Sequence, residues 1–277
     1  MAAKNPTVSV IIPCFNHGEF IDEAVDSVLR QTIQNFEIII VNDGSTDHKT
    51  RETLKNYQRN KTTIFHTENR GPAAARNFGI AKSQGEFILP LDADDKIGED
   101  YLETGVEILK SHPKLGIVYC EAEFFGKEKR GKWNLPEYSY PEILYENQIF
   151  CSGLFRRVDW EKVGGYDEEM VFGLEDYDFW LSLIETGKGV FRIPKTMFFY
   201  RYQSHSRNNK LEMENLWKSY SKIFHNHAEL YKENSEQIFR KMVELRQEVI
   251  RLRHSRIFAL SRFLGKIPLL KNFLEAL

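Results

Sequence analysis

Cysteine is scarce in this chain, and its scarcity excludes two classes of protein. Cys14, Cys120 and Cys151 are the three cysteines among 277 residues, and they lie far apart in the sequence. An odd number of cysteines without a Cys-x-x-Cys pair provides neither a disulfide framework nor a zinc knuckle. Because free cysteines are typical of reducing compartments, we expect a cytoplasmic protein.

Long hydrophobic runs and an excess of one charge are also missing. The longest apolar run, at 36–41, has the length of a strand and falls far short of the roughly 20 apolar residues of a membrane span. The first residues contain one lysine and no apolar core, so we expect no signal peptide. The 38 Lys and Arg residues nearly balance the 40 Asp and Glu residues. Without a basic field, we expect no nucleic-acid partner.

The first 120 residues alternate two kinds of pattern. Short β-branched segments predict strands at 8–12, 37–41, 62–66, 87–91 and 116–119. Between them, apolar residues at three- and four-residue spacing predict helices, one of which we expect Asp47 to cap. This alternation predicts an α/β fold with a Rossmann-like, mostly parallel sheet flanked by helices. After residue 206 the pattern is helical to the end, with a break near 233–235.

Two acidic clusters follow predicted strands. Ligands of parallel sheets bind beyond the carboxyl ends of the strands, so Asp43 and the group Asp92, Asp94 and Asp95 should face one crevice. Three carboxylates in four residues repel one another unless a cation offsets them, and Mn2+ or Mg2+ prefers such oxygen ligands. The alternative for this group is an acidic turn that caps a helix. For the Asp43 turn, the alternative is a tight turn before a capped helix.

Basic and further acidic residues lie at predicted helix starts. Arg70 and Arg76 precede or open a helix whose dipole favours anions, so they are suited to a diphosphate; alternatively, Arg76 pairs with a nearby carboxylate. Glu175 and Asp176 open another helix, where they stabilise its dipole or take a proton from an incoming hydroxyl. His205 follows the last predicted strand and either contacts a metal or phosphate or lies on the surface.

Together, these segments resemble the family 2 inverting glycosyltransferases, which have the A-type glycosyltransferase (GT-A) fold. The resemblance extends over about residues 7–205, with the motifs in the order and at the spacing of the family. The segments that carry it are VSVIIPCFN at 8–16, FEIIIVNDGSTD at 36–47, NRGPAAARNFG at 69–79, GEFILPLDADD at 85–95, VGGYDE at 163–168, Glu175-Asp176 and Tyr200-Arg201.

The resemblance implies a role for each matching position. Pro13, Phe15 and Asp43 would hold the nucleotide base, and Asp92 and Ala93 would contact the ribose. Arg70 and Arg76 would contact the diphosphate or the base. The metal, Mn2+ or Mg2+, would bind Asp94, with His205 closing over the diphosphate. Asp176 would be the catalytic base, with Glu175 beside it facing the acceptor or the sugar.

The resemblance also implies the reaction and the partners. The donor would be a nucleotide-diphosphate sugar, a UDP-sugar in the commonest case, and the acceptor a hydroxyl of a glycan or lipid-linked saccharide. Deprotonation of that hydroxyl by Asp176 would invert the anomeric centre in one displacement. Residues 1–206 would form the transferase domain, with a nucleotide-binding half (1–95) and an acceptor half (96–206). Residues 207–277 would be a helical extension.

The closing segment differs from this pattern. Between Arg246 and Lys271 there are seven basic residues and one acid, interleaved with apolar residues. Such a segment either lies on the inner face of an anionic membrane as a peripheral contact or packs on the core or on a second copy of the chain in a homodimer.

Other classes of protein fit the sequence pattern less well. A nicotinamide dehydrogenase needs a glycine fingerprint after the first strand, where this chain has Pro13-Cys14-Phe15-Asn16-His17-Gly18. A phosphatase or response regulator needs its key Asp after that strand. A sugar nucleotidyltransferase needs a glycine-rich basic loop there. A binding protein that has lost turnover would keep the fold, but Asp43, Asp94 and Asp176 are all present.

Overall fold

The computed structural model describes residues 5–127, 130–203 and 212–254. The chain divides into two compact units, residues 1–228 and 229–277, which are described separately below. His205 lies outside the described residues. The division falls after residue 228, whereas the sequence pattern places the domain boundary after residue 206.

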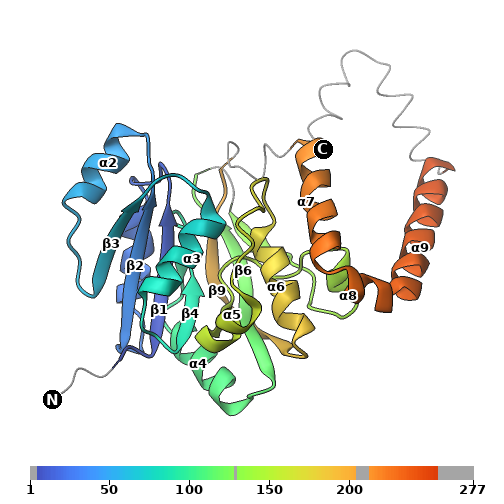
Figure 1. Cartoon of the computed structure of the whole chain (residues 1–277), viewed down its shortest axis with the longest axis horizontal. Coiled ribbons are helices and arrows are strands. Elements are labelled where there is room, and N and C mark those ends of the chain that lie inside the picture. Colours follow the sequence, from blue (N-terminus) through green and yellow to red (C-terminus); the bar gives the residue numbers. More distant parts are fainter. Residues whose placement is uncertain (1–4, 128–129, 204–211, 255–277) are drawn as a thin grey trace. The chain divides into compact units, whose positions relative to one another are not determined.

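The first half of the sheet is parallel, as the alternating pattern predicts (Figure 1). Its strands are β1 (Val8–Cys14), β2 (Phe36–Asp43), β3 (Thr62–Thr67) and β4 (Phe87–Pro90), in the spatial order β3-β2-β1-β4. Each pair of neighbours is parallel. The connections contain the helices α1 (Ile21–Leu29), α2 (His48–Lys55) and α3 (Pro72–Lys82).

The second half of the sheet is mixed. It contains β6 (Leu115–Phe125), β8 (Leu154–Arg156), β9 (Gly189–Arg201) and β5 (Lys96–Ile97), and β7 (Gly131–Trp133) pairs with β6. Strand β8 runs antiparallel between β4 and β6, while β6 and β9 form a long parallel pair. The antiparallel pairings cover two or three residue pairs each. Parallel pairing therefore prevails, and the predicted fold class is confirmed.

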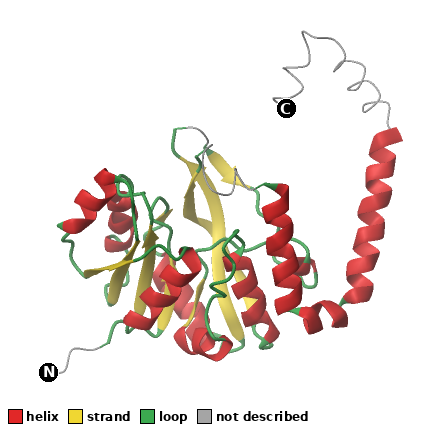
Figure 2. Ribbon diagram, turned by 45° about the horizontal axis from the view of Figure 1, so that its top comes forward, coloured by secondary structure: helices red, strands yellow, loops and turns green. Residues whose placement is uncertain are grey.

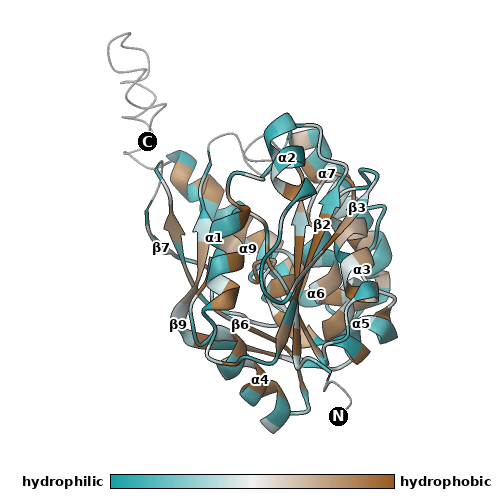
Figure 3. Ribbon diagram, turned by 90° about the vertical axis from the view of Figure 1, so that its left-hand side faces the viewer, coloured by the Kyte–Doolittle hydropathy of each residue, from teal (hydrophilic) through white to brown (hydrophobic). Residues whose placement is uncertain are grey.

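Helices cover both faces of the sheet. α3, α5 (Arg157–Val163) and α6 (Glu175–Glu185) lie on one face and α1 on the other (Figures 1 and 3); α4 (Tyr101–Ser111) packs against β6 and β8. The apolar strands between these helices form the core. Gly79 lets α3 approach the sheet closely, because a Cβ at this position would lie 2.5 Å from Cγ2 of Ile11.

The strand register brings the predicted site loops to one edge of the sheet. Cys14 at the end of β1 pairs with Asn42 near the end of β2, and Ile11 pairs with Pro90 at the end of β4. The loops that follow these strands therefore leave the sheet side by side (Figure 2). The predicted cap is confirmed: Oδ2 of Asp47 accepts the backbone N–H of Thr50 at 2.7 Å at the start of α2.

Helix α7 (Met213–Asn226) belongs to the first unit because its C-terminal end packs on α6. His227 is 2% exposed, with Nε2 3.2 Å from Oδ1 of Asp178 and Nδ1 3.1 Å from Oε2 of Glu185. Asn226 also donates to Asp178, at 2.8 Å. These contacts place the end of the first unit beyond residue 206.

The chain continues through α8 (Ala228–Glu233) and α9 (Ser235–His254). The predicted break at 233–235 is confirmed, because α8 ends at Glu233 and α9 begins at Ser235. Among the described residues, no helix is both long enough and apolar enough to cross a membrane. Most of the basic closing segment, from residue 255 on, lies outside the described residues.

Candidate active site

Asp43 organises the loop between β3 and α3. Its side chain is nearly buried at the end of β2, and its two oxygens accept the backbone N–H groups of Arg70 and Gly71, each at 2.9 Å. Gly71 has a φ of +88°, a conformation that glycine adopts without strain. A carboxylate has about four acceptor positions, so Asp43 can still accept a further hydrogen bond from a ligand.

The loop after β1 is tied to the start of α2. Oδ1 of Asn16 accepts the backbone N–H groups of Thr46 and Asp47 at 2.8 and 2.9 Å. Asn16 itself has a φ of +60°. Phe15 is 42% exposed, and Pro13 is half-buried in β1.

Arg76 joins the two halves of the site. The side chain projects from α3, is 2% exposed, and donates from Nη2 to Asp92 and from Nη1 to Glu175, both at 2.8 Å. Burial opposes the charge, but the two carboxylates outweigh it and raise the pKa of the guanidinium well above its usual value. Arg76 therefore has the carboxylate partners that the sequence left as an alternative, and one of them lies 99 residues away.

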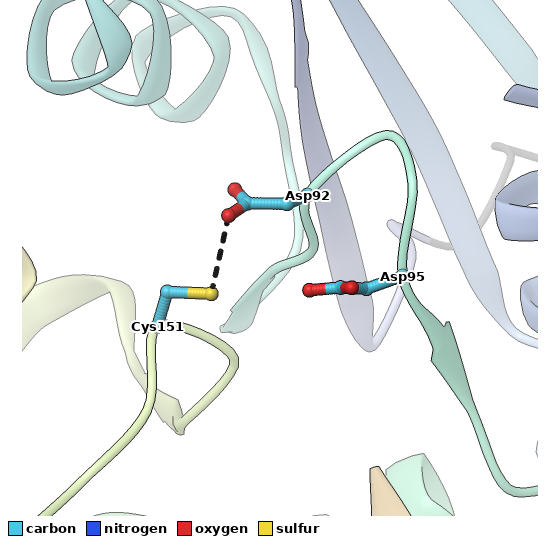
Figure 4. Close-up of side chains that lie close together, drawn as sticks. All are labelled: Asp92, Asp95 and Cys151. Atoms are coloured by element: carbon cyan, nitrogen blue, oxygen red, sulfur yellow. Dashed lines mark hydrogen bonds between the residues drawn. The ribbon is translucent and has the colours of Figure 1, made fainter. Parts of the chain in front are cut away.

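The side chains of Asp92, Asp95 and Cys151 lie close together (Figure 4). Sγ of Cys151 is 3.5 Å from Oδ2 of Asp92, and the three side chains offer ligand atoms within 4.8 Å of one another. Burial raises the pKa of the Cys151 thiol well above its ordinary value, so the thiol stays protonated and donates to Asp92. Ala93, which follows Asp92 in the sequence, is also buried.

Asp95 carries an unsatisfied oxygen. The side chain is 1% exposed; Oδ1 accepts the backbone N–H of Arg201 at 2.8 Å, and Oδ2 has no hydrogen-bond partner among the described residues. Burial, followed by the charges of Asp94 and Asp92, raises its pKa well above the ordinary value. No helix begins at Asp95, since β5 follows it, so the helix-cap alternative is wrong. A buried carboxylate oxygen without a hydrogen-bond partner, in a cluster of acids, is a suitable ligand for a hard divalent cation.

Asp94 points to a different set of partners. Its Oδ1 lies 3.5 Å from Nδ1 of His17, and its Oδ2 accepts from Nε2 of Gln203 at 3.0 Å. The hydrogen bond that Asp94 accepts from the His17 imidazole raises the pKa of that imidazole. The sequence interpretation missed His17 and Gln203. The signal for His17 was its position in the loop directly after the first strand, at the same edge as the acids.

The carboxyl of Asp176 has a raised pKa. It lies half-buried in the first turn of α6 and accepts the backbone N–H of Tyr177 at 2.8 Å. Burial, and next the negative charge of Glu175, raise the pKa of Asp176 to about 7. A base with a pKa near the working pH combines an available lone pair with a strong drive to accept a proton.

The remaining predicted residue lies further out. Arg70 is 68% exposed and donates to Glu168 at 2.6 Å. Asn77, which follows Arg76, binds the turn before Glu168: it donates to the Tyr166 carbonyl at 2.8 Å and accepts from Nε1 of Trp160 at 3.1 Å. Trp160 is thereby part of the scaffold of this turn.

An aromatic cluster borders the acids on the side of β6 and β9. Trp133 of β7 stacks on Phe124 with ring centroids 5.2 Å apart, and it lies 5.0 Å from Tyr200. Burial, followed by Asp95, Asp92 and Asp94, raises the pKa of Tyr200. This coupling places Tyr200 within electrostatic reach of the acids at 92–95.

A sheet edge with this arrangement of acids, on this fold, defines an A-type glycosyltransferase, and the comparisons with known proteins give the family. The profile described as "Glycosyl transferase family 2" matches residues 9–170. A glycosyltransferase of Rickettsia typhi is 31% identical over 233 residues, covering 79% of this chain and 72% of the relative. Bacillus subtilis TuaG, whose name places it in teichuronic acid biosynthesis, is 30% identical over 242 residues, covering 83% and 90%.

Solved structures agree on the fold. S. aureus TarS in complex with UDP superposes with a TM-score of 0.62 at 19% identity, covering 79% of this chain and 65% of that chain. TarS in complex with UDP-GlcNAc gives a TM-score of 0.65, also at 19% identity, covering 79% of this chain and 66% of that one. The chain belongs to the family 2 glycosyltransferases and is a transferase with the GT-A fold.

Proposed function

We propose that this chain is an inverting glycosyltransferase that moves a sugar, a hexose or an N-acetylhexosamine, from a UDP-sugar to a hydroxyl of a glycan or lipid-linked saccharide. The observation that carries the proposal is Asp176, with a pKa raised to about 7 beside the Arg76 ion pairs. The UDP and UDP-GlcNAc complexes of TarS support the donor class. The name of TuaG supports a saccharide acceptor.

On the donor side, the exposed ring of Phe15 and the half-buried Pro13 would contact the base, and Asp43 would accept from its ring N–H. Asp43 is suited to this because two backbone N–H groups already fix its carboxylate. Asp92 and Ala93 would contact the ribose. Arg70 would reach the diphosphate after leaving Glu168, which is feasible for an exposed ion pair that contributes little to stability. Arg76 would act on the donor through Asp92.

Asp94 would hold a divalent metal, with Asp92 and Oδ2 of Asp95, unpartnered among the described residues, nearby and His205 as a further ligand. The oxygen-rich set suits Mn2+ or Mg2+. When bound, such an ion would neutralise charge on the departing diphosphate.

On the acceptor side, Asp176 would take the proton of the attacking hydroxyl while the sugar–phosphate bond breaks. Attack from the face opposite the leaving group inverts the anomeric centre without a protein nucleophile. Arg76 would orient Glu175, the neighbour of the base, and Trp133 would offer its apolar ring to a face of the acceptor sugar.

The test is donor turnover by the wild type and by Asp176→Asn. We expect the wild type to release UDP in the presence of acceptor, and Asp176→Asn to lose a factor of about 100 to 10,000 in kcat while UDP still stabilises it against heat. Glu169→Gln, which removes a 79% exposed carboxylate from the nearby turn, is the matched control. Full turnover by Asp176→Asn would refute the assignment of the base.

Metal and base specificity are tested by thermal stabilisation with nucleoside diphosphates, with Mn2+ and then with a chelator. A ligand at about 100 times its Kd stabilises the native state by roughly 2.7 kcal/mol. Stabilisation by UDP that requires the metal supports the proposal. Stabilisation by GDP alone would overturn the role of Asp43, and binding without turnover of any sugar donor would favour a binding protein.

The basic closing segment would place the enzyme on the cytoplasmic face of an anionic membrane. Co-sedimentation of the full chain with anionic vesicles, compared with neutral vesicles, tests this part of the proposal. Equal binding to both would argue against an electrostatic contact.

A further inference from the structure

Helix α9 carries an apolar seam that its own unit leaves exposed. Apolar residues recur along it at alternating intervals of four and three residues: Ile238, Met242, Leu245, Val249 and Leu252. Met242, Leu245, Val249 and Leu252 are 58, 47, 46 and 57% exposed. A repeat of 3.5 residues is the pattern of a coiled-coil seam, and the exposed side chains of Phe239, Val243 and Ile250 widen the apolar face beside it.

This helix needs a partner for its stability. It has 20 residues and none of them is buried, and it is about 30 Å long at 1.5 Å per residue. Helices in water gain most of their stability from packing an apolar face. The seam is therefore the surface through which α9 would pack on a partner.

The charges beside the seam identify the partner. In a heptad assignment, the a positions are Met242 and Val249, and the d positions are Ile238, Leu245 and Leu252. Lys241 and Glu248 then occupy g positions. If a second α9 is laid antiparallel so that Met242 faces Leu245 of the other copy, then Ile238 faces Val249. In this register Lys241 of each copy faces Glu248 of the other.

The other flank is complementary in the same register. Phe239 and Arg246 occupy e positions. In this register Phe239 of one copy faces Arg246 of the other, which pairs an exposed aromatic ring with a guanidinium. A parallel pair is less favourable, because Lys241 would face Arg246 of the other copy while only Glu248 and Arg253 would attract. The helix is thus complementary to itself about a twofold axis, as a symmetric dimer requires.

From this complementarity we infer that α9 is a dimerisation element, through which two copies of the chain associate as a short antiparallel coiled coil. The interface needs no other protein. Its core consists of four apolar layers, formed by Ile238 with Val249 and Met242 with Leu245 from each copy. The flanks add two ion pairs and two cation–π contacts.

The first experiment measures the mass of the full chain by sedimentation velocity over a wide concentration range. We expect a monomer–dimer equilibrium for the wild type. Leu245→Glu places a charge in the seam and is expected to weaken the dimer at least about a hundredfold, as burial of an unpaired charge does. Gln247→Glu adds the same charge on the outer face of α9 and should leave the equilibrium unchanged. A wild-type chain that is monomeric at every concentration overturns the inference.

Charge exchange tests the orientation of the helices. In the antiparallel dimer, Lys241→Glu and Glu248→Lys each create two like-charge contacts and should weaken association severalfold, whereas the double variant should restore it. In a parallel dimer, Lys241→Glu would instead strengthen association, because the new glutamate would face Arg246. Strengthening by Lys241→Glu, or failure of the double variant to recover, overturns the antiparallel arrangement.

A membrane surface is the competing occupant of the seam. If the chain stays monomeric and Leu245→Glu, but not Gln247→Glu, abolishes its binding to anionic vesicles, the seam packs on lipid and the dimer is refuted. Stabilisation by UDP and Mn2+, measured in parallel, shows that each variant is folded. Its failure in the wild type would count against the proposed donor and not against the dimer.

Discussion

Two groups of carboxylates at the site are held in different ways. At the end of β2, Asp43 is fixed by the backbone N–H groups of Arg70 and Gly71. Asp92 after β4 and Glu175 at the start of α6 both accept instead from one side chain, Arg76. Backbone donors are present whatever the local sequence, whereas a side-chain donor is lost by one substitution. The position of Asp43 should therefore tolerate mutation of its surroundings better than the positions of Asp92 and Glu175.

Replacing Arg76 should have the largest effect on stability. Arg76→Met should lower the free energy of unfolding by about 3–5 kcal/mol, because two carboxylates lose a buried partner. Urea-induced unfolding measures the loss. Arg59→Met is the matched control: Arg59 also contacts two carboxylates, Asp22 and Asp26, but is 31% exposed, and should cost at most about 1 kcal/mol. Equal losses would show that Arg76 has no special structural role.

The second prediction concerns the pH dependence of the catalytic edge. Because the pKa of Asp176 is raised to about 7, the ionised base is depleted as the pH falls below this value. We expect kcat/KM to fall about tenfold per pH unit, reaching about a hundredfold at two units below the pKa. The pH–rate profile of UDP release measures this. A profile that stays flat down to pH 5 would exclude Asp176 as the titrating base.

The third prediction compares helix packing on the two halves. A Cβ at Gly79 would meet Cγ2 of Ile11 at 2.5 Å and Cγ2 of Val41 at 3.1 Å, both on central strands. Gly79→Ala should therefore cost about 1–3 kcal/mol. Gly105→Ala on α4 meets Cδ2 of Leu154 at 2.8 Å, the end of a longer side chain that can rotate, and should cost less. Thermal unfolding of the two variants provides the comparison.

The smallest effect concerns a helix cap. Asp47→Ala should cost about 1 kcal/mol, because the N–H of Thr50 loses its acceptor. Asp100 occupies the equivalent position of α4 without a side-chain cap hydrogen bond, so Asp100→Ala should change stability by less. If both variants lose the same stability, the cap of α2 contributes no more than a surface charge.

The parts that sequence predicted well are those that local patterns determine. The β-branched runs marked β1 to β4, and the parallel register follows from their alternation with helices. The acids after β2 and β4 could be placed at one edge for the same reason. The direction of β8 could not be predicted, because three residues of strand carry no information on their partner.

Long-range side-chain pairs could not be predicted from the sequence for a related reason. The bond between Arg76 and Glu175 spans 99 positions, and a single chain offers many other carboxylates to a buried arginine. Cys151 beside Asp92, and Gln203 beside Asp94, likewise depend on how distant loops meet. The motif order indicated which residues belong to the site, but only the tertiary structure shows which of them touch.

Asn77 has a consequence for how such enzymes diversify. Its amide fastens α3 to the turn at Tyr166, and the neighbouring Arg76 fastens the same helix to the start of α6. One turn of helix thus fixes both flanks of the turn between α5 and α6. The segment at 130–150 is tied to the same helix α6, because the carbonyl of the buried Ile143 accepts from the hydroxyl of Tyr177. A graft of that segment from a relative would have to keep this buried contact if Glu175 and Asp176 are to keep their places.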